Sequence, residues 1–452
     1  MIYISIKYLF FIIFLFTFPF LNIQGQSEEY FIKFNNSLSR SEINEFALKY
    51  IDLESAVFEC PFTIDDLKLQ HTYVVKNLPL SSITKLANFK KFEIEYIEKI
   101  PNYKLFLTPN DLGSNQWGLN RINAEQAWDI STGNNILIGL IDDAIELNHT
   151  DLQANIWTNP GEILGNGIDD DFNGYIDDVN GWDAADNDND PNPPSSASNS
   201  FFSHGTHCAG ISGAVTNNNI GISSIGFNSK IVPIKIGLDA TGSLSGAYQG
   251  VDYAIASGVK IISMSWGGAG YSITYQNLFD YAHSIGIISI AAAGNNNSSN
   301  PMYPASYNHV ISVGASNPND LKANFSNFGP TIDVMAPGTN IYSTTPNSSY
   351  SFKSGTSMAC PLVSGLTALM LGRNPLLSPD ELEACLKTTC DDISSQNPNY
   401  IGQLGAGRIN AFAALQCTRS ISCNFTSNHT SICPNSTVQY TDLSNNSPTS
   451  WE

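Results

Sequence analysis

The sequence predicts an α/β fold, in which a mostly parallel sheet lies between two layers of helices. Short apolar runs of strand length alternate along the chain with amphipathic segments of helix length. Strands that are apolar throughout are buried on both faces, which is typical of parallel sheets covered by helices. The expected strands are 136–141, 230–236, 260–264, 287–292 and 310–315, and the expected helices are 204–215, 243–257, 275–284, 357–372 and 410–415.

A smaller α+β region precedes this fold. The alternation of apolar and polar residues predicts strands at 30–34, 71–75 and 92–98. Helices are expected at 41–50, capped by Ser39 or Ser41, and at 81–89. This order suits a small open-faced sandwich.

The two ends of the chain differ from the rest in composition. Lys7 precedes an apolar run at 9–20, which is typical of a secretory signal peptide and short for a membrane span. We expect residues 1–25 to be removed from an exported protein that has no membrane span after signal removal and in which disulfides can form. After Cys417 the chain becomes rich in Ser, Thr and Asn with β-type alternation, so 419–452 is expected to begin a β-rich module.

The charge distribution excludes one class of partner and favours another. The formal net charge is −20, and no Lys or Arg lies between Arg121 and Lys230. A nucleic-acid partner is excluded, because phosphate binding requires clustered positive charge. Acidic residues mixed with Asn and Gly favour bound cations, although a solvated acidic surface is the alternative.

Four polar residues lie where strands end or helices begin. Ser357 opens an apolar helix among small residues, where the helix terminus favours a nucleophile, although a serine there can simply cap the helix. Asp142 follows an apolar strand, His204 begins a helix, and Asn295 ends another strand. Together they could supply an orienting acid, a base, an oxyanion donor and a nucleophile.

The order of these residues and the short sequence motifs around them resemble those of the subtilases, the subtilisin-like serine proteases. His204 opens His-Gly-Thr-His-Cys-Ala-Gly and Ser357 lies in Gly-Thr-Ser-Met-Ala, and the resemblance covers 108–416. It implies a three-layer subtilisin-like fold and a monomeric endopeptidase that acts on protein or peptide substrates. By resemblance, Ser357 is the nucleophile, His204 the base and then acid, and Asp142 the acid that orients His204. Asn295 and the Ser357 N–H form the oxyanion hole.

The resemblance also implies a groove in which an extended peptide adds as a strand between two edges. These edges are Gly242, Ser243 and Leu244 on one side and Ser265, Trp266 and Gly267 on the other. The P1 side chain would enter between the second edge and a wall formed by Ala292, Ala293 and Gly294. Met302 is expected at the floor of a shallow apolar pocket, unless it turns into the core.

The residue after Asp142 departs from the family pattern. Subtilisins usually have serine or threonine and then glycine there, whereas this chain has Asp143 and Ala144. A double aspartate resembles the kexin and furin branch, which implies a modest preference for a basic P2 residue without a strict need for arginine at P1. Alternatively, like-charge repulsion from Asp143 makes Asp142 harder to ionise and reduces activity at acid pH.

Structural Ca²⁺ is the expected cofactor. By resemblance to the strong calcium site of the family, the ligands are the side chains of Asp111, Asp151 and Asn218 and the carbonyls of Thr216, Ile220 and Ile222. A second site resembles that of one family member and uses Asp183, Asp188 and Asp190. The segment 169–178 matches the first half of an EF-hand loop, which predicts Asp169, Asp171 and Asn173 as ligands. Position 12 is Asn180, so a complete EF-hand is not expected.

The resemblance assigns the remaining regions. Residues 26–106 would be a propeptide that assists folding, acts as an intramolecular inhibitor and is cleaved near Phe106 or Leu107. The peptidase domain would be 107–418, and 419–452 the start of a PKD-type repeat. Cys385, Cys390 and Cys417 could form one disulfide, and a bond between Cys208 and Cys360 stays open. Two other functions remain: a secreted binding protein with a catalytically weak subtilase fold, and an esterase that uses the same triad.

Overall fold

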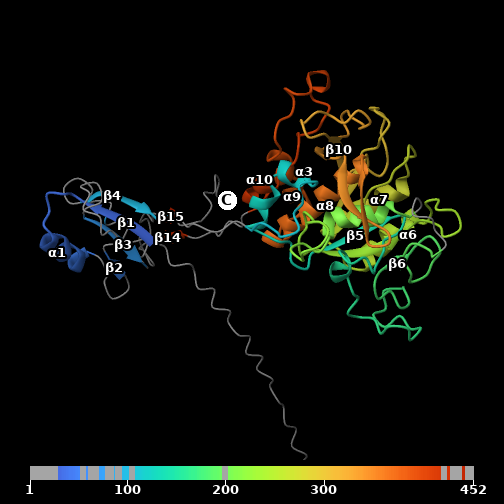
Figure 1. The fold of residues 1–452 in the computed structure, drawn as a ribbon, viewed down its shortest axis with the longest axis horizontal. Helices are drawn as coiled ribbons and strands as arrows, with labels where there is room; N and C mark the ends of the chain where they lie inside the picture. Colours follow the sequence, from blue (N-terminus) through green and yellow to red (C-terminus); the bar gives the residue numbers. More distant parts are fainter. Residues whose placement is uncertain are drawn as a thin grey trace, which may run out of the picture. The chain divides into compact units, whose positions relative to one another are not determined.

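The computed structural model describes residues 29–50, 57–59, 71–76, 86, 94–100, 107–195, 202–418, 425–427 and 440–442. The chain divides into two compact units between Leu105 and Phe106 (Figure 1). No helix in the described part of the chain is both long and apolar enough to span a membrane.

The first unit contains a four-stranded antiparallel sheet with one described helix. Its strands are β1 (Glu29–Phe34), β2 (Val57–Glu59), β3 (Thr72–Lys76) and β4 (Ile94–Lys99), in the order β2-β3-β1-β4. Helix α1 (Arg40–Tyr50) begins after Ser39, whose hydroxyl accepts a hydrogen bond from the Glu42 N–H (3.3 Å). Three strands and this helix confirm the expected elements, β2 is additional, and the expected helix at 81–89 lies outside the described residues except for Leu86.

The second unit is built on a seven-stranded sheet whose paired strands are all parallel. The order is β11-β10-β9-β8-β5-β7-β6, and the five strands expected from the sequence are all present. The strands are β5 (Leu137–Asp142), β6 (Trp182–Asp183), β7 (Lys230–Lys235), β8 (Ile261–Met264), β9 (Ile288–Ala292), β10 (Val310–Ser316) and β11 (Val334–Pro337).

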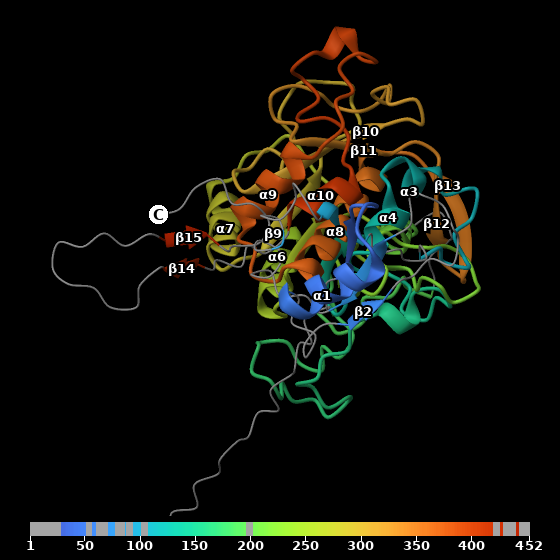
Figure 2. The same ribbon diagram turned by 90° about the vertical axis from the view of Figure 1, so that its left-hand side faces the viewer.

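Helices cover both faces of this sheet, which confirms the three-layer architecture. Helices α5 (His204–Gly213) and α8 (Thr356–Arg373) pack on one face, and α6 (Ala247–Ala256) and α7 (Ile273–Ser284) pack on the other. Figure 2 shows α7 on one side of β9 and α8 on the other. Successive strand residues point to opposite faces, so Leu140 joins the core beneath α8 and Ile141 joins the core on the other side.

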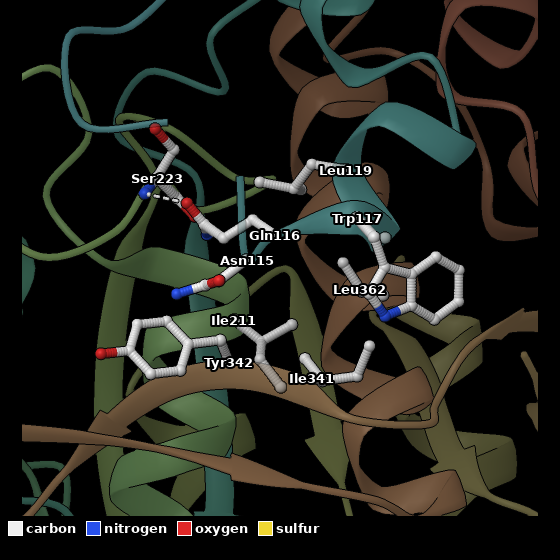
Figure 3. A pocket seen from close by; sticks show the side chains of 10 residues that line it. Asn115, Gln116, Trp117, Leu119, Ile211, Ser223, Ile341, Tyr342 and Leu362 are labelled. Atoms are coloured by element: carbon white, nitrogen blue, oxygen red, sulfur yellow. Dashed lines mark hydrogen bonds between the residues drawn. The ribbon is translucent and has the colours of Figure 1, made fainter. Parts of the chain in front are cut away.

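Shorter elements complete the second unit. They are α3 (Trp117–Arg121), α4 (Ala124–Trp128), the 3₁₀ turns η1 (Gln153–Asn155) and η2 (Pro398–Tyr400), the antiparallel pair β12 (Ile341–Thr345) and β13 (Ser349–Lys353), α9 (Pro379–Thr388), α10 (Ala411–Cys417), and the antiparallel pair β14 (Phe425–Ser427) and β15 (Tyr440–Asp442). A cavity of about 20 Å³ lies beside Trp117, Ile211 and Leu362 (Figure 3). It has room for about one water molecule and none for a substrate.

One disulfide is present among the described residues. It joins Cys385 of α9 to Cys417 of α10, as one of the expected pairings. Cys208 and Cys360 are both buried free thiols, so the bond considered between them does not form. The sulfur of Cys360 instead points at two carbonyls, those of Met264 and Ile290, each 3.6 Å away.

Candidate active site

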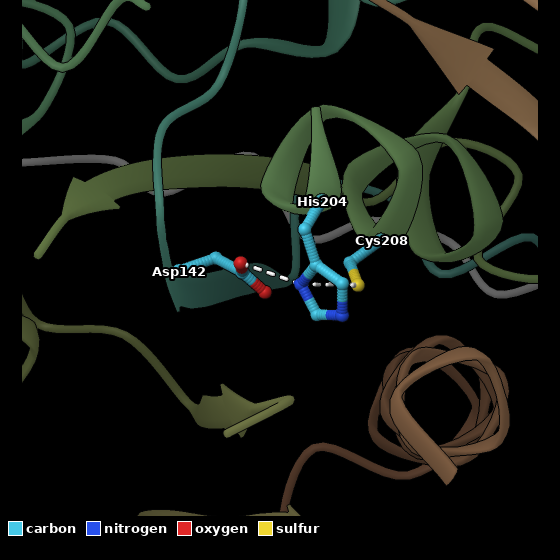
Figure 4. A group of neighbouring side chains, drawn as sticks. All are labelled: Asp142, His204 and Cys208. Atoms are coloured by element: carbon cyan, nitrogen blue, oxygen red, sulfur yellow. Dashed lines mark hydrogen bonds and ion pairs between the residues drawn. The ribbon is translucent and has the colours of Figure 1, made fainter. Parts of the chain in front are cut away.

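Asp142 and His204 meet where β5 ends and α5 begins. The apolar strand β5 places Asp142 at its last residue, and His204 is the first residue of α5. His204 Nδ1 lies 2.7 Å from Asp142 Oδ1 (Figure 4). The side chain of Asp142 is 5% exposed and that of His204 is 34% exposed, so the acid is shielded while the imidazole remains reachable. This arrangement fixes one tautomer and orientation of the ring.

The charge of Asp142 makes His204 a stronger base. Burial is the largest single influence and lowers the pKa of His204, but the negative charge of Asp142, the hydrogen bond to Asp142 and the neighbouring Cys208 together raise the pKa well above its ordinary value. Cys208 Sγ is 3.9 Å from His204 Nδ1, and burial raises the pKa of this thiol, so it is neutral at physiological pH. Asp142 is therefore the main source of the raised pKa, and the neutral imidazole needed for catalysis becomes more populated as the pH rises.

Asp143 holds the backbone of the same histidine. Its carboxylate accepts hydrogen bonds from the N–H groups of His204 (3.0 Å), Gly205 (2.7 Å) and Ala144 (2.7 Å). Gly205 permits this approach, since a Cβ there would lie 2.4 Å from the Ala144 carbonyl oxygen. A carboxylate at a helix N-terminus is stabilised by the unpaired N–H groups. These contacts direct both oxygens of Asp143 to the start of α5, which favours a positioning role over contact with a P2 side chain.

Pro361 explains how the nucleophile's backbone is anchored. Every residue of α8 from Thr356 to Leu371 is buried. Because proline has no N–H, the carbonyl of Ser357 cannot accept the usual bond from the residue four positions later. Ser265 Oγ donates to this carbonyl instead (2.9 Å), as does Cys208 Sγ (3.4 Å). The backbone of Ser357 is thereby tied to the end of β8 and to the helix that carries His204.

The hydroxyl of Ser357 points away from its expected partner. Ser357 Oγ donates to the carbonyl oxygen of Ser265 (3.0 Å), and among the described residues it has no hydrogen bond to His204. Catalytic hydrogen bonds often form or tighten only when substrate is bound. Transfer of the proton to His204 requires the hydroxyl to leave the Ser265 carbonyl.

Thr356 orients the amide of Asn295. The Asn295 Oδ1 accepts from the Thr356 N–H (2.8 Å) and from its hydroxyl (3.0 Å). The opposite end of the amide, Nδ2, lies above Gly355, where a Cβ would be 3.4 Å away. This donor is beside the nucleophile and has no acceptor among the described residues, as an oxyanion donor requires. No motif considered in the sequence analysis predicts this role for Thr356.

The expected groove residues lie on two short irregular edges. Leu244 pairs with Gly237, and the carbonyl of Ser243 accepts from the Leu238 N–H (3.0 Å). Gly242 has a φ of 68°, so a turn rather than a helix precedes α6. The helix expected at 243–257 therefore begins only at Ala247, which leaves Ser243 and Leu244 exposed as an edge and Gly242 half-buried.

The second edge continues from β8 and is anchored at both ends. Ser265 is buried, and Trp266 Nε1 donates to the Ile141 carbonyl (3.0 Å) beside the catalytic acid. Gly267 is exposed and leads to a pair of backbone bonds between Gly268 and Tyr303.

Met302 faces the expected wall. Ala292 and Ala293 are buried at the end of β9, and Gly294 follows with a φ of 102°. A Cβ at Gly294 would lie 3.2 Å from Met302 Cγ, so the methionine packs against this turn. The structure therefore brings Met302 to the wall 292–294.

Three of the expected calcium ligands converge on one loop. Asp151 Oδ1 accepts from Asn218 Nδ2 (2.8 Å), and Asp111 Oδ2 accepts from the Asn218 N–H (2.8 Å). Thr216, Ile220 and Ile222 lie in the same loop, and the Ile222 N–H donates to Asp151 Oδ2 (2.9 Å). Burial raises the pKa of Asp151 to about 6, and the charge of Asp111 adds to the shift. Carboxylates crowded with amide and carbonyl oxygens suit a calcium ion.

The acidic loop at 169–178 lies beside a further carboxylate, that of Glu162, which the EF-hand pattern did not predict. Asn173 donates from its backbone to Asp169 Oδ1 (3.1 Å) and Asp171 Oδ1 (3.0 Å). The carboxylates of Asp169, Asp171 and Glu162 have oxygens within 4.8 Å of one another. Glu162 precedes the EF-hand-like segment, so the EF-hand spacing could not reveal it. Asn180, at position 12, donates to the Trp157 carbonyl instead (2.9 Å).

A lysine lies at the expected calcium site of Asp183, Asp188 and Asp190. Lys235 is 1% exposed, and its ammonium forms ion pairs with Asp183 and with Asp239 (2.7 Å). Asp188 and Asp190 lie in the following turn, where the Asp188 carboxylate accepts from the Asp190 N–H (2.9 Å). Asp183 therefore already has a cationic partner, and a calcium ion here would compete with Lys235.

Comparisons with known proteins agree with this geometry. The model of the subtilase family of peptidases matches residues 133–407. Thermitase from Thermoactinomyces vulgaris is 37% identical over 313 residues, covering 68% of this chain and 99% of thermitase. Subtilisin BL from Lederbergia lenta is 32% identical over 300 residues, covering 66% of this chain and 97% of that protein. A solved structure among proteases from Pseudoalteromonas arctica is 30% identical with a TM-score of 0.56, and covers 69% of this chain and 100% of its own. The chain belongs to the subtilase family and is a serine-type endopeptidase.

Proposed function

We propose that this endopeptidase is secreted and cleaves proteins through Asp142, His204 and Ser357. The 2.7 Å contact between His204 Nδ1 and Asp142 carries the proposal, because it turns the other ring nitrogen toward substrate as a base. Ser357 Oγ would attack the scissile carbonyl as His204 takes its proton. Asn295 Nδ2 and the Ser357 N–H would stabilise the oxyanion, and His204 would then protonate the leaving amine.

Casein hydrolysis tests this proposal. The wild-type protein should degrade casein, and a serine-directed covalent inhibitor should stop degradation while labelling Ser357. Unlabelled Ser357 together with full inhibition would show that another residue is the nucleophile. The relatives include extracellular proteases from Xanthomonas campestris and Natrialba magadii, which supports secretion.

We further propose that Ca²⁺ stabilises the peptidase unit at the Asp111–Asp151–Asn218 loop, with the Glu162–Asp169–Asp171 loop as a second site. The ion would supply positive charge to carboxylates that otherwise repel one another. Nothing in the reaction steps above requires it.

Removal of calcium should lower the melting temperature. A ligand that binds only the folded state stabilises it by about 2.7 kcal/mol at 100 times its dissociation constant. This should appear as several degrees between chelator and millimolar Ca²⁺ in thermal unfolding of the Ser357→Ala variant, which cannot digest itself. Asp151→Asn should remove most of the difference, whereas Asp252→Asn, at a carboxylate outside both sites, should preserve it. An unchanged melting temperature in chelator would refute the calcium sites.

A further inference from the structure

Two histidines and two aspartates from three segments meet on the second unit, and none belongs to the catalytic, groove or calcium residues. His283 lies in the last turn of α7, with Asp280 one turn earlier, His309 precedes β10, and Asp380 lies in the first turn of α9. The two imidazole rings stack with centroids 3.9 Å apart. His283 Nε2 lies 2.9 Å from Asp380 Oδ1, and His309 Nε2 lies 3.9 Å from Asp280 Oδ1. We call these four residues the His283–His309 cluster.

The cluster has an excess of negative charge. Among the described residues, neither Asp280 nor Asp380 forms an ion pair with a lysine or arginine. Their ion-pair partners are the two histidines, and Asp280 Oδ1 also accepts a hydrogen bond from Gln276 Nε2 (2.7 Å). While both imidazoles are neutral, neither carboxylate therefore has a cation beside it to balance its negative charge. A divalent ion would supply that compensation.

The donor atoms are close enough to share one ion. One ligand atom each from His283, His309 and Asp380 lies within 4.8 Å of the others. A metal centre would require these atoms to close onto one ion at bonds of roughly 2.0–2.2 Å. Imidazole nitrogen with carboxylate oxygen suits zinc, copper or nickel, whereas calcium takes oxygen ligands.

His309 has a φ of 63°, in the left-handed region, where histidine is enriched among the non-glycine residues. The surrounding structure holds the residue in this conformation, with its ring against that of His283.

We propose that the His283–His309 cluster binds a divalent transition-metal ion, with Zn²⁺ coordinated by His283, His309 and Asp380. The ion joins the end of α7 to the start of α9, and α9 is bonded to α10 through Cys385 and Cys417. Metal binding therefore fastens the C-terminal helices to the helix layer that contains α7. It stabilises the fold and takes no part in peptide hydrolysis.

Calorimetric titration with Zn²⁺ tests the proposal in the full-length Ser357→Ala variant with saturating Ca²⁺. We expect one zinc ion bound per chain and a higher melting temperature. His283→Gln and His309→Asn should each weaken binding at least 10-fold and remove the increase in melting temperature. Glutamine is a good helix former and asparagine tolerates the left-handed region, so both variants should fold. Circular dichroism in the absence of zinc checks this.

The catalytic residues offer a competing site, which the same variants distinguish. Asp142, His204 and Cys208 also place donor atoms within 4.8 Å of one another. Zinc bound there would persist in His309→Asn and inhibit hydrolysis by the active enzyme. Zinc bound at the cluster should leave hydrolysis unchanged. Binding equal in the parent and both histidine variants, or no binding up to millimolar zinc, would overturn the proposal.

Discussion

Replacing Ser357 with alanine is expected to lower kcat roughly 10⁶-fold, because residues that act as one catalytic unit lose nearly all of their effect together. The variant should nevertheless fold. Its carbonyl keeps the bonds from Ser265 and Cys208, and only the 3.0 Å bond from its own hydroxyl is lost. Such a bond contributes about 1 kcal/mol.

Self-cleavage near residue 106 is a second measurement that distinguishes the Ser357→Ala variant from the wild type. The chain divides into compact units between Leu105 and Phe106, close to the cleavage site expected from the sequence. The wild type should therefore release a fragment ending near Phe106, and the alanine variant should remain full length. Ser354→Ala is the matched control, since this hydroxyl three residues earlier is exposed and, within the described part of the chain, accepts a single hydrogen bond, from the Asn340 N–H (2.8 Å). Cleavage of purified Ser357→Ala at the same position would argue against self-processing by this serine.

Five of the seven strands of the parallel sheet were predictable because each is a largely apolar run, as expected for strands buried on both faces. The other two, β6 and β11, are only two and four residues long and were not predicted. The pair β12–β13 was missed because polar residues such as Ser343 and Thr344 are buried there. Their hydroxyls donate to the backbone of α5, to the carbonyls of His207 (2.8 Å) and Thr206 (2.6 Å). Helix α9 was not predicted either, although the capping box of Ser378 and Glu381 marks its start.

The candidate catalytic residues could be predicted because they lie at strand ends and helix starts within specific motifs. The contacts that support them could not be predicted. Lys235 reaches Asp183 and Asp239 across 52 and 4 positions of sequence, and Glu162 approaches the acidic loop from outside its motif. Contacts of this kind depend on how the chain folds back on itself, which composition and spacing do not encode. The same holds for Asp143, whose bonds to the start of α5 span 61 and 62 positions.

Replacing Asp142 with asparagine is expected to lower kcat about 10⁴-fold with little change in KM. An asparagine amide can donate to the ring and so favour the tautomer in which the other nitrogen carries the proton and cannot act as a base. The loss of the negative charge of Asp142 also changes how kcat/KM depends on pH. Asp142 raises the pKa of His204, and activity requires the neutral ring, so wild-type kcat/KM should rise with pH through a value above the ordinary histidine range. In the variant this limb should move to lower pH.

Asp143→Asn separates these two effects. It removes a negative charge beside the same histidine but leaves the 2.7 Å contact between His204 and Asp142 in place. The acid limb should again move to lower pH, while kcat should fall far less than in Asp142→Asn. If the two variants lost the same activity, charge near His204 would matter more than the tautomer that Asp142 fixes. If Asp142→Asn stayed within 10-fold of the wild type, the orienting role of Asp142 would be wrong. Asp142 contacts the side chain of His204, and Asp143 accepts a hydrogen bond from its backbone. Comparing the pH profiles of the two variants therefore separates the contribution of each aspartate to activity.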